Sequence, residues 1–195
     1  MAGVHAIRSV GESIRVFLLA SYPADLAAAF PCTFQVLSSG QLARFEDPTE
    51  STVTVTLYLY RVTVCEHPRN GRSGHSSSVP DRSLPLELHW LMTVWSASPA
   101  AEHAVFAWAM RELHARPLLD ASTLTADGEW GASETVQVIP EELPIESMMR
   151  IWDALDPSYR LSASYVARIV RVDPPARTAP LPVLAVRLGV GQEEG

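Results

Sequence analysis

Several side chains able to bind metal ions occur in this sequence, but their spacing does not match that of a known metal site. Six histidines are present, and none forms the HExxH pattern or the four-residue helical pair that holds zinc in many hydrolases. His103 and His114 belong to one predicted helix, where a separation of eleven residues places them about three turns apart, too far to share an ion. Cys65, His67 and His75 form the remaining combination, in a segment without a recognised ligand spacing. We therefore expect no bound metal.

Motifs for nucleophilic or acid–base chemistry are equally weak. No serine lies in a G-x-S-x-G elbow, and the run Ser76–Ser78 falls in a polar segment. The glycines do not form a phosphate-binding loop after a strand. Glu141 and Glu142 begin a predicted helix, where carboxylates interact favourably with the helix dipole, so we expect them to be structural. The sequence predicts no catalytic residues and no cofactor, and it does not favour an enzyme.

The composition is that of a folded, acidic protein. Of its 195 residues 47% are hydrophobic and 19% are charged, and the formal net charge is −7. All 15 strong bases are arginines, and they form no basic stripe, so we expect no nucleic-acid partner. No segment reaches the roughly 20 apolar residues that a membrane helix requires, and no export signal is visible at the N-terminus. We expect a cytoplasmic protein without a membrane partner, in which Cys32 and Cys65 are free thiols.

Hydrophobic periodicity predicts the elements that must position any functional side chain. The clearest strand is 52–65, where β-branched and aromatic residues alternate with polar ones. Its even-numbered residues should form a half-polar face that a helix or a partner covers: Thr54, Thr56, Tyr58 and Tyr60. The expected helices are 3–20, 26–30, the segment between Pro99 and Pro117, and 141–155; the expected strands are 33–37, 52–65, 86–96, 134–139 and 160–173; and 38–51 is expected to be a loop with room for an edge strand.

These elements favour an α+β fold with a mixed, mostly antiparallel sheet flanked by helices. We expect one domain over 1–173, with a mobile loop at 66–84 that lacks any apolar period. Residues 174–182 are rich in proline and unsuited to a sheet, whereas Leu181–Leu188 (LPVLAVRL) is apolar enough for another strand. This C-terminal arm, 174–195, either folds back as an edge strand or adds to the sheet of a neighbouring subunit.

The order of four segments resembles that of one protein family. The segments are VTLYLYRVTVCEHPRN, LPLELHWLMTVWS, AEHAVFAWAMRELHARPLL and IESMMRIWDALDPSYRLSASYVARIVRVD. Within residues 1–174, the chain resembles the tail-cap, or tail-terminator, proteins of phage-tail-like contractile injection systems. The caps of the antifeeding prophage and of virulence-cassette particles belong to this family.

The resemblance implies a phage tail-terminator-like fold with a structural role. In that family the protein forms a hexameric ring that closes the distal end of the inner tube and contractile sheath, and so controls tail length. The implied partners are other copies of the chain and the terminal tube and sheath subunits, in a particle that stays inside the cell or is released. We expect subunit, tube or sheath contacts at Tyr60, Arg61, Arg69 and Trp95. Ordinary sheet packing is the competing interpretation for the two aromatic residues, and solvation for the two arginines.

Two other functions remain open at this stage. An assembly adaptor or chaperone would escort another tail component without staying in the particle. A small-molecule-binding or hydrolase domain would need a deep pocket into which several polar groups converge.

Overall fold

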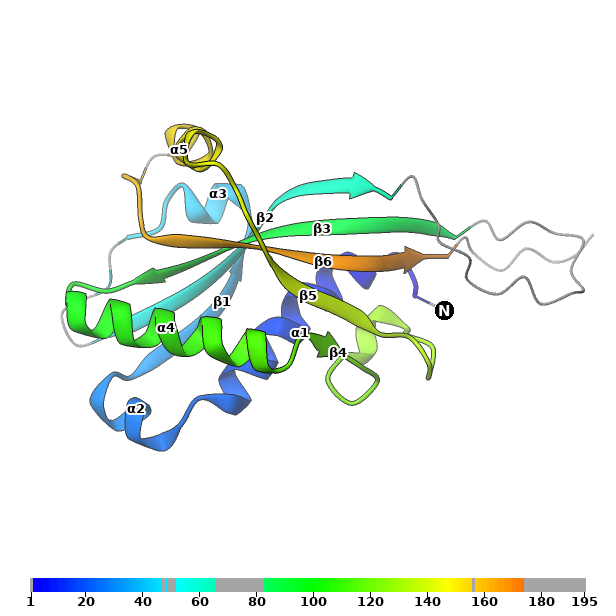
Figure 1. The fold of residues 1–195 in the computed structure, drawn as a ribbon, viewed down its shortest axis with the longest axis horizontal. Coiled ribbons are helices and arrows are strands. Elements are labelled where there is room, and N and C mark those ends of the chain that lie inside the picture. The colour runs from blue at the N-terminus through cyan, green and yellow to red at the C-terminus, as the bar shows by residue number, and fades with distance from the viewer. Residues whose placement is uncertain (1, 47, 49–51, 66–82, 156, 174–195) are drawn as a thin grey trace, which may run out of the picture.

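A six-stranded sheet forms the centre of the computed structural model, which describes residues 2–46, 48, 52–65, 83–155 and 157–173 (Figure 1). The strands are β1 (Cys32–Leu37), β2 (Val53–Val64), β3 (Leu84–Trp95), β4 (Leu118–Leu119), β5 (Val136–Glu141) and β6 (Ser162–Val172). They lie in the order β1-β2-β3-β6-β5-β4. The β1–β2 pair is parallel, and the other four pairs are antiparallel. The predicted α+β fold with a mixed, mostly antiparallel sheet is confirmed.

Helices cover the two faces of the sheet unequally. They are α1 (Ala6–Ser21), α2 (Ala24–Ala29), α3 (Ser39–Leu42), α4 (Pro99–Ala115) and α5 (Ile145–Asp153), with the 3-10 helix η1 (Ala126–Gly128). In Figure 1, α1, α2 and α4 lie on one side of the sheet, which we call the first face. On the opposite side, the second face, α3 and α5 cover only one end. Within the described residues, no helix is both long and apolar enough to cross a bilayer.

Each face has its own hydrophobic core. The first core joins α1 and α4 to the sheet through apolar residues at helical spacing, such as Val10, Ile14 and Val105. The ring of Trp90 lies so close to α1 that a Cβ at Gly11 would overlap it, so this crossing requires glycine. The second core is built from Leu37, Leu42, Leu91, Trp95, Met148 and Trp152. The half-polar face predicted for residues 52–65 is therefore covered at one end by helices of the same chain.

Four elements differ from the sequence-based expectation. The segment 38–51, expected to be a loop, contains α3, which begins at a capping box formed by Ser38 and Gln41. The last helix begins at Ile145 instead of residue 141, because Glu141 ends β5 and Pro144 precedes the helix. The sequence analysis did not anticipate β4 and η1, which are only two and three residues long.

The structure describes only a small part of the predicted loop and none of the predicted arm. Leu84, placed at the end of the loop, is instead the first residue of β3. Residues 66–82 and the whole arm, 174–195, lie outside the described residues. The domain boundary at 173 stays a prediction.

Candidate polar contact site on the second face

Polar side chains occupy the part of the second face that α3 and α5 leave uncovered. Six of them, contributed by four neighbouring strands, form what we call the polar cluster: Tyr60, Arg61, Thr63, His89, Glu141 and Ser164. Their strands, β2, β3, β6 and β5, are consecutive in the sheet. Residues far apart in the sequence are thus brought together by sheet register.

An irregularity in β2 places two of these residues on the same face. The register of β2 against β3 shifts between Leu59 and Arg61, as it does at a β-bulge. Tyr60 consequently contacts the second core, and Arg61 on the same face lies opposite His89. Without the shift, strict alternation would point Arg61 into the first face.

Glu141 is the centre of the cluster and accepts hydrogen bonds from three strands. The Tyr60 hydroxyl donates to Oε2 at 2.8 Å, and the Ser164 hydroxyl donates to the same atom at 3.0 Å. Nδ1 of His89 lies 2.9 Å from Oε2, and Nη2 of Arg61 lies 3.2 Å from Oε1. The carboxylate is thereby held by four donors.

The other ring nitrogen of His89 also has a partner. Its Nε2 lies 3.1 Å from Oγ1 of Thr63. Because a carboxylate only accepts, Nδ1 donates to Glu141, and Nε2 has the Thr63 hydroxyl as its partner. The His89 side chain is only 4% exposed, and Nη2 of Arg61 lies 3.1 Å from its Nδ1.

These contacts favour the charged form of Glu141. Burial alone raises the pKa of this carboxyl, but hydrogen bonds from His89, Tyr60 and Ser164 outweigh it and lower the pKa. Burial raises the pKa of the Tyr60 hydroxyl, with a further contribution from the neighbouring carboxylate. A charged glutamate beside a neutral phenol is the stable state around neutral pH.

The cluster contains one series in the order of a catalytic triad. Thr63, His89 and Glu141 are connected as hydroxyl, histidine and carboxylate, whereas Ser164 bonds directly to the carboxylate. The one half-exposed member in contact with Glu141 is Arg61, whose side chain is 49% exposed. The cluster therefore presents a fixed guanidinium at the surface of an otherwise saturated network.

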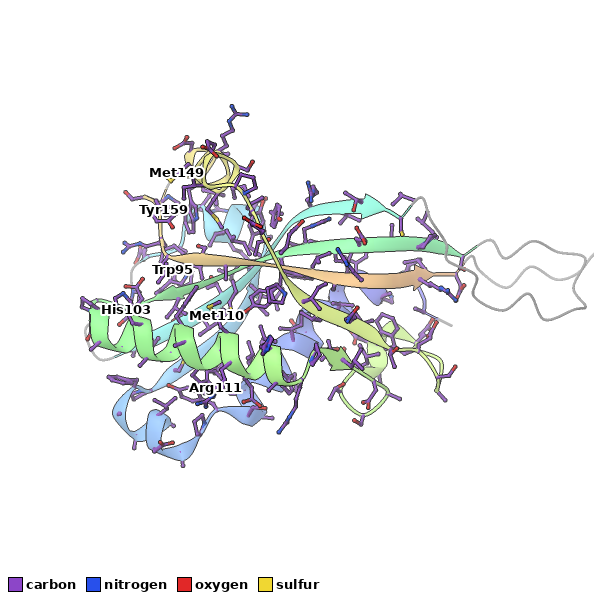
Figure 2. The ribbon with its side chains drawn as sticks, viewed as in Figure 1. Trp95, His103, Met110, Arg111, Met149 and Tyr159 are labelled. Atoms are coloured by element: carbon purple, nitrogen blue, oxygen red, sulfur yellow. The ribbon has the colours of Figure 1, made fainter. Side chains whose placement is uncertain are left out.

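The four residues predicted as contacts have different outcomes. Tyr60 and Arg61 are brought together in the polar cluster, and Arg69 lies outside the described residues. Trp95 is 1% exposed, and its indole nitrogen donates to Oγ1 of Thr56 at 2.9 Å. Its ring packs edge-on against Trp152, at 5.9 Å between centroids. Figure 2 shows Trp95 beneath the end of the molecule where Met149 and Tyr159 are labelled. Trp95 thus packs in the second core, and its contact with another subunit, tube or sheath stays a prediction.

His89, Glu141 and Ser164 were missed as members of a site. Glu141 was expected to begin a helix, but it ends β5 with its side chain toward β2 and β3. The one available signal was His89, an imidazole within a largely apolar strand. Its partner could not be identified without the register of β3, β6 and β5.

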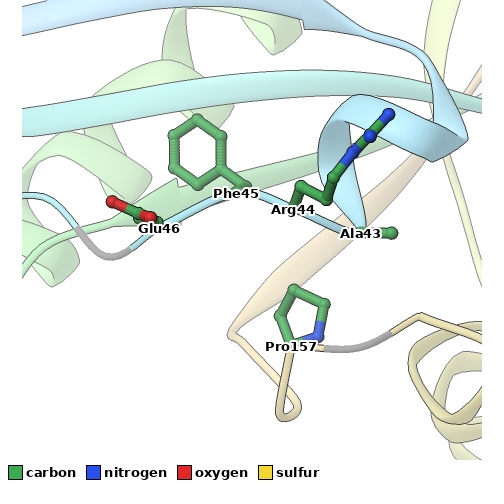
Figure 3. Close-up of a pocket in the computed structure, with 5 residues that line it drawn as sticks. All are labelled: Ala43, Arg44, Phe45, Glu46 and Pro157. Carbon is green, nitrogen blue, oxygen red and sulfur yellow. The ribbon is translucent and has the colours of Figure 1, made fainter.

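A second feature on this side is an open surface hollow. Figure 3 shows its lining: Ala43, Arg44, Phe45, Glu46 and Pro157. The Phe45 ring packs on Trp95 at 4.6 Å between centroids, so this wall belongs to the second core. Such a hollow is not the deep, polar pocket that a small-molecule enzyme needs. Nowhere in the part of the chain that the structure describes do three or more potential metal ligands gather.

Comparison with known proteins identifies the family. The model of the Pvc16 N-terminal domain matches residues 9–185. The chain belongs to this family. The resemblance to tail-cap proteins noted from the sequence is confirmed. No curated protein matches the chain.

Two solved structures share the fold. One is a sheath/tube terminator of PVC, an extracellular contractile injection system, in the extended state; it is 20% identical, with a TM-score of 0.56. The other is the tube-terminating cap of the anti-feeding prophage, 15% identical, with a TM-score of 0.55. The alignments cover 96% and 97% of this chain but only 64% and 62% of the two larger chains. This chain therefore corresponds to somewhat under two thirds of those proteins.

Proposed function

We propose that this chain is a structural cap that terminates the inner tube and contractile sheath of a phage-tail-like injection system. The observation that carries the proposal is the family match over 9–185 together with a shared fold that spans nearly the whole chain. Both similar structures are described as terminators, one of sheath and tube and the other of the tube. The saturated polar cluster is consistent with a role in contact rather than in catalysis.

The cap is proposed to be a ring of identical copies, six in number, that limits tail length. A ring closes when two different surfaces of each copy are complementary and their rotations add to a full turn. Termination then requires that one side of the ring bind the last tube and sheath layer while the other side offers no equivalent site. The particle that carries this cap is proposed to be assembled in the cytoplasm.

Arg61 is the described residue that we propose as a contact, with Tyr60 holding its surroundings in place. Its guanidinium is half-exposed, and Glu141 fixes it at 3.2 Å, so little side-chain entropy remains to be lost on binding. A partner carboxylate is the group that such an arginine recognises best. Arg69, the loop 66–84 and the arm 174–195 are proposed as further contacts.

Loss of the gene tests the capping role directly. We expect particles with abnormally long or open-ended tails in electron micrographs, and complementation by the intact gene should restore uniform length. Tails of normal length in the deletion strain would refute the proposal. Absence of the chain from purified particles would instead favour an assembly adaptor.

The contact role of Arg61 is tested by charge reversal. Arg61→Glu should weaken assembly of the cap or its binding to tails, while the isolated chain remains folded by circular dichroism. Arg116→Glu is the matched control, because Arg116 is 65% exposed, with a loose ion pair to Glu112 at 3.9 Å and its guanidinium 5.7 Å from the centroid of the Phe17 ring. Equal effects of the two substitutions would argue against a specific contact at Arg61.

A further inference from the structure

The outer edge of β2 pairs with no described strand over its second half. β1 pairs with β2 only as far as Leu37 opposite Tyr58. Beyond that point, Leu59–Val64 is hydrogen-bonded to β3 on one side, and no described strand pairs with its other side. In Figure 1 this end of β2 lies at the margin of the sheet, past the end of β1. An unpaired strand edge is a template for another strand.

The direction of the free backbone groups follows from the β2–β3 ladder. The amide of Cys65 donates to the carbonyl of Pro85 at 2.9 Å, so residue 65 faces β3. Because hydrogen-bonding direction alternates along an antiparallel strand, residues 61 and 63 face β3 as well. Val62 and Val64 thus direct their amide and carbonyl groups outward.

Apolar side chains are uncovered at the same place. Val62 is 43% exposed and Val64 is 57% exposed, although they lie opposite the buried residues Leu88 and Leu86 of the first core. Leu84, on the neighbouring strand, is 45% exposed. The first core thus continues to this edge, where no described helix or strand lies over these side chains. A strand added here would satisfy the outward backbone groups and shield these side chains together.

We propose that residues 181–188 of a neighbouring copy form the strand that pairs with Leu59–Val64. This inference rests on the homo-oligomer proposed above. The segment LPVLAVRL alternates so that Leu184, Val186 and Leu188 share one face, which suits the uncovered Val62 and Val64. A strand of this kind adds main-chain hydrogen bonds for affinity and side-chain contacts for specificity.

The position at which the described chain ends favours a neighbour over the same copy. Val172, the last residue of β6, lies opposite Leu84, at the end of the sheet where β2 also ends. The amide of Asp173 donates to the carbonyl of Ala2 at 3.0 Å, so the last described residue is held beside the N-terminal segment. Reaching the β2 edge of the same copy requires a reversal across three strand spacings, about 14 Å.

The intervening sequence opposes such a reversal. Four prolines fall within residues 174–182: Pro174, Pro175, Pro180 and Pro182. Proline-rich segments favour an extended spacer of about 3.1 Å per residue. The seven residues 174–180 would span about 22 Å, which is enough to cover about 14 Å, but a stiff spacer disfavours the change of direction and so favours a strand on another subunit. Each copy would then donate one strand and accept one, which is the head-to-tail arrangement that a closed ring requires.

Disulfide cross-linking tests the pairing. In a background with Cys32→Ser and Cys65→Ser, one preparation carries Val62→Cys, and a second series carries a single cysteine at one of positions 183–187. After the preparations are mixed and mildly oxidised, we expect a disulfide-linked product of twice the chain mass for one or two adjacent positions of the series. A further preparation carries the same two cysteines in one chain. If it forms only intramolecular disulfides, the inference is overturned.

Oligomer measurements distinguish this inference from the proposed function. Val62→Pro removes an outward amide without touching the β2–β3 ladder, and we expect it to raise the concentration at which oligomers dissociate at least about tenfold. Deletion of 181–195 should do the same, whereas deletion of 189–195 should not. If rings persist in both Val62→Pro and the deletion of 181–195, the strand exchange is refuted but the proposed capping function is not. An unaltered chain that stays monomeric, alone and with tube and sheath subunits, refutes the proposed assembly as well.

Discussion

Replacement of Glu141 by glutamine is the most direct test of the polar cluster. The glutamine side chain would keep one acceptor oxygen for the hydroxyls of Tyr60 and Ser164, while its new amide would face the donor nitrogen of His89. Hydrogen bonds to a charged acceptor contribute about 1.5–3 kcal/mol each, and the half-exposed Arg61 pair adds at most about 1 kcal/mol. Because part of the network survives, we expect Glu141→Gln to lower the free energy of unfolding by about 2–4 kcal/mol at pH 7.

The stability that Glu141 contributes should depend on pH. The pKa of Glu141 is lowered in the folded protein. Its contribution to stability is therefore complete above the unfolded pKa, about 4.3, and is lost as the pH falls through the lower folded value. The difference between the unaltered chain and the variant should thus be large at pH 7 and should shrink steadily below about pH 4.3.

Urea unfolding followed by tryptophan fluorescence measures the free energy of unfolding of the unaltered chain and of Glu141→Gln, at pH 7 and in acid. Glu87→Gln is the matched control on the same face, since Glu87 pairs with the half-exposed Arg168 at a longer 3.5 Å. We expect the control to cost less than about 1 kcal/mol at pH 7. A variant at position 141 that costs no more than the control, or whose cost is unchanged in acid, would show that the carboxylate does not hold the strands together.

Three further substitutions test the two cores. Gly11→Ala gains about 1 kcal/mol of helix propensity but inserts a methyl group into the ring of Trp90, so we expect a net loss of roughly 1–2 kcal/mol in urea unfolding. Ser13→Ala removes the acceptor of the Thr125 amide, at 2.9 Å, and should cost about 1–3 kcal/mol in the same assay. Trp95→Ala should cost about 3–5 kcal/mol, whereas a surface contact at this position would leave stability unchanged and reduce assembly only.

The long elements were predictable because their patterns are local. The alternation in 52–65 and the three- and four-residue steps of the first helix directly reflect the periods of a strand and a helix. Short elements lack that repetition: β4 pairs through only two residues, and α3 depends on a single capping box. Such pieces depend on tertiary contacts that a sequence window does not contain.

The polar cluster could not be predicted from the sequence, because its hydrogen bonds join residues of separate segments. Glu141 meets His89 across 52 residues of sequence, through the pairing of β5 with β6 and of β6 with β3. The bulge at Tyr60 adds an offset that strict alternation cannot supply. The sequence therefore indicates Arg61 as a contact without the carboxylate that fixes it, since Glu141 is expected there to begin a helix.

The place of β6 in the sheet has a consequence for synthesis. This strand is the last of the described elements in the chain, yet it lies between β3 and β5 and joins them. A nascent polypeptide that stops before Ser162 holds two separate pieces, β1-β2-β3 and β5-β4, with the inner edges of both exposed. The sheet can close only after this strand leaves the ribosome, so incomplete translation products should be prone to aggregation.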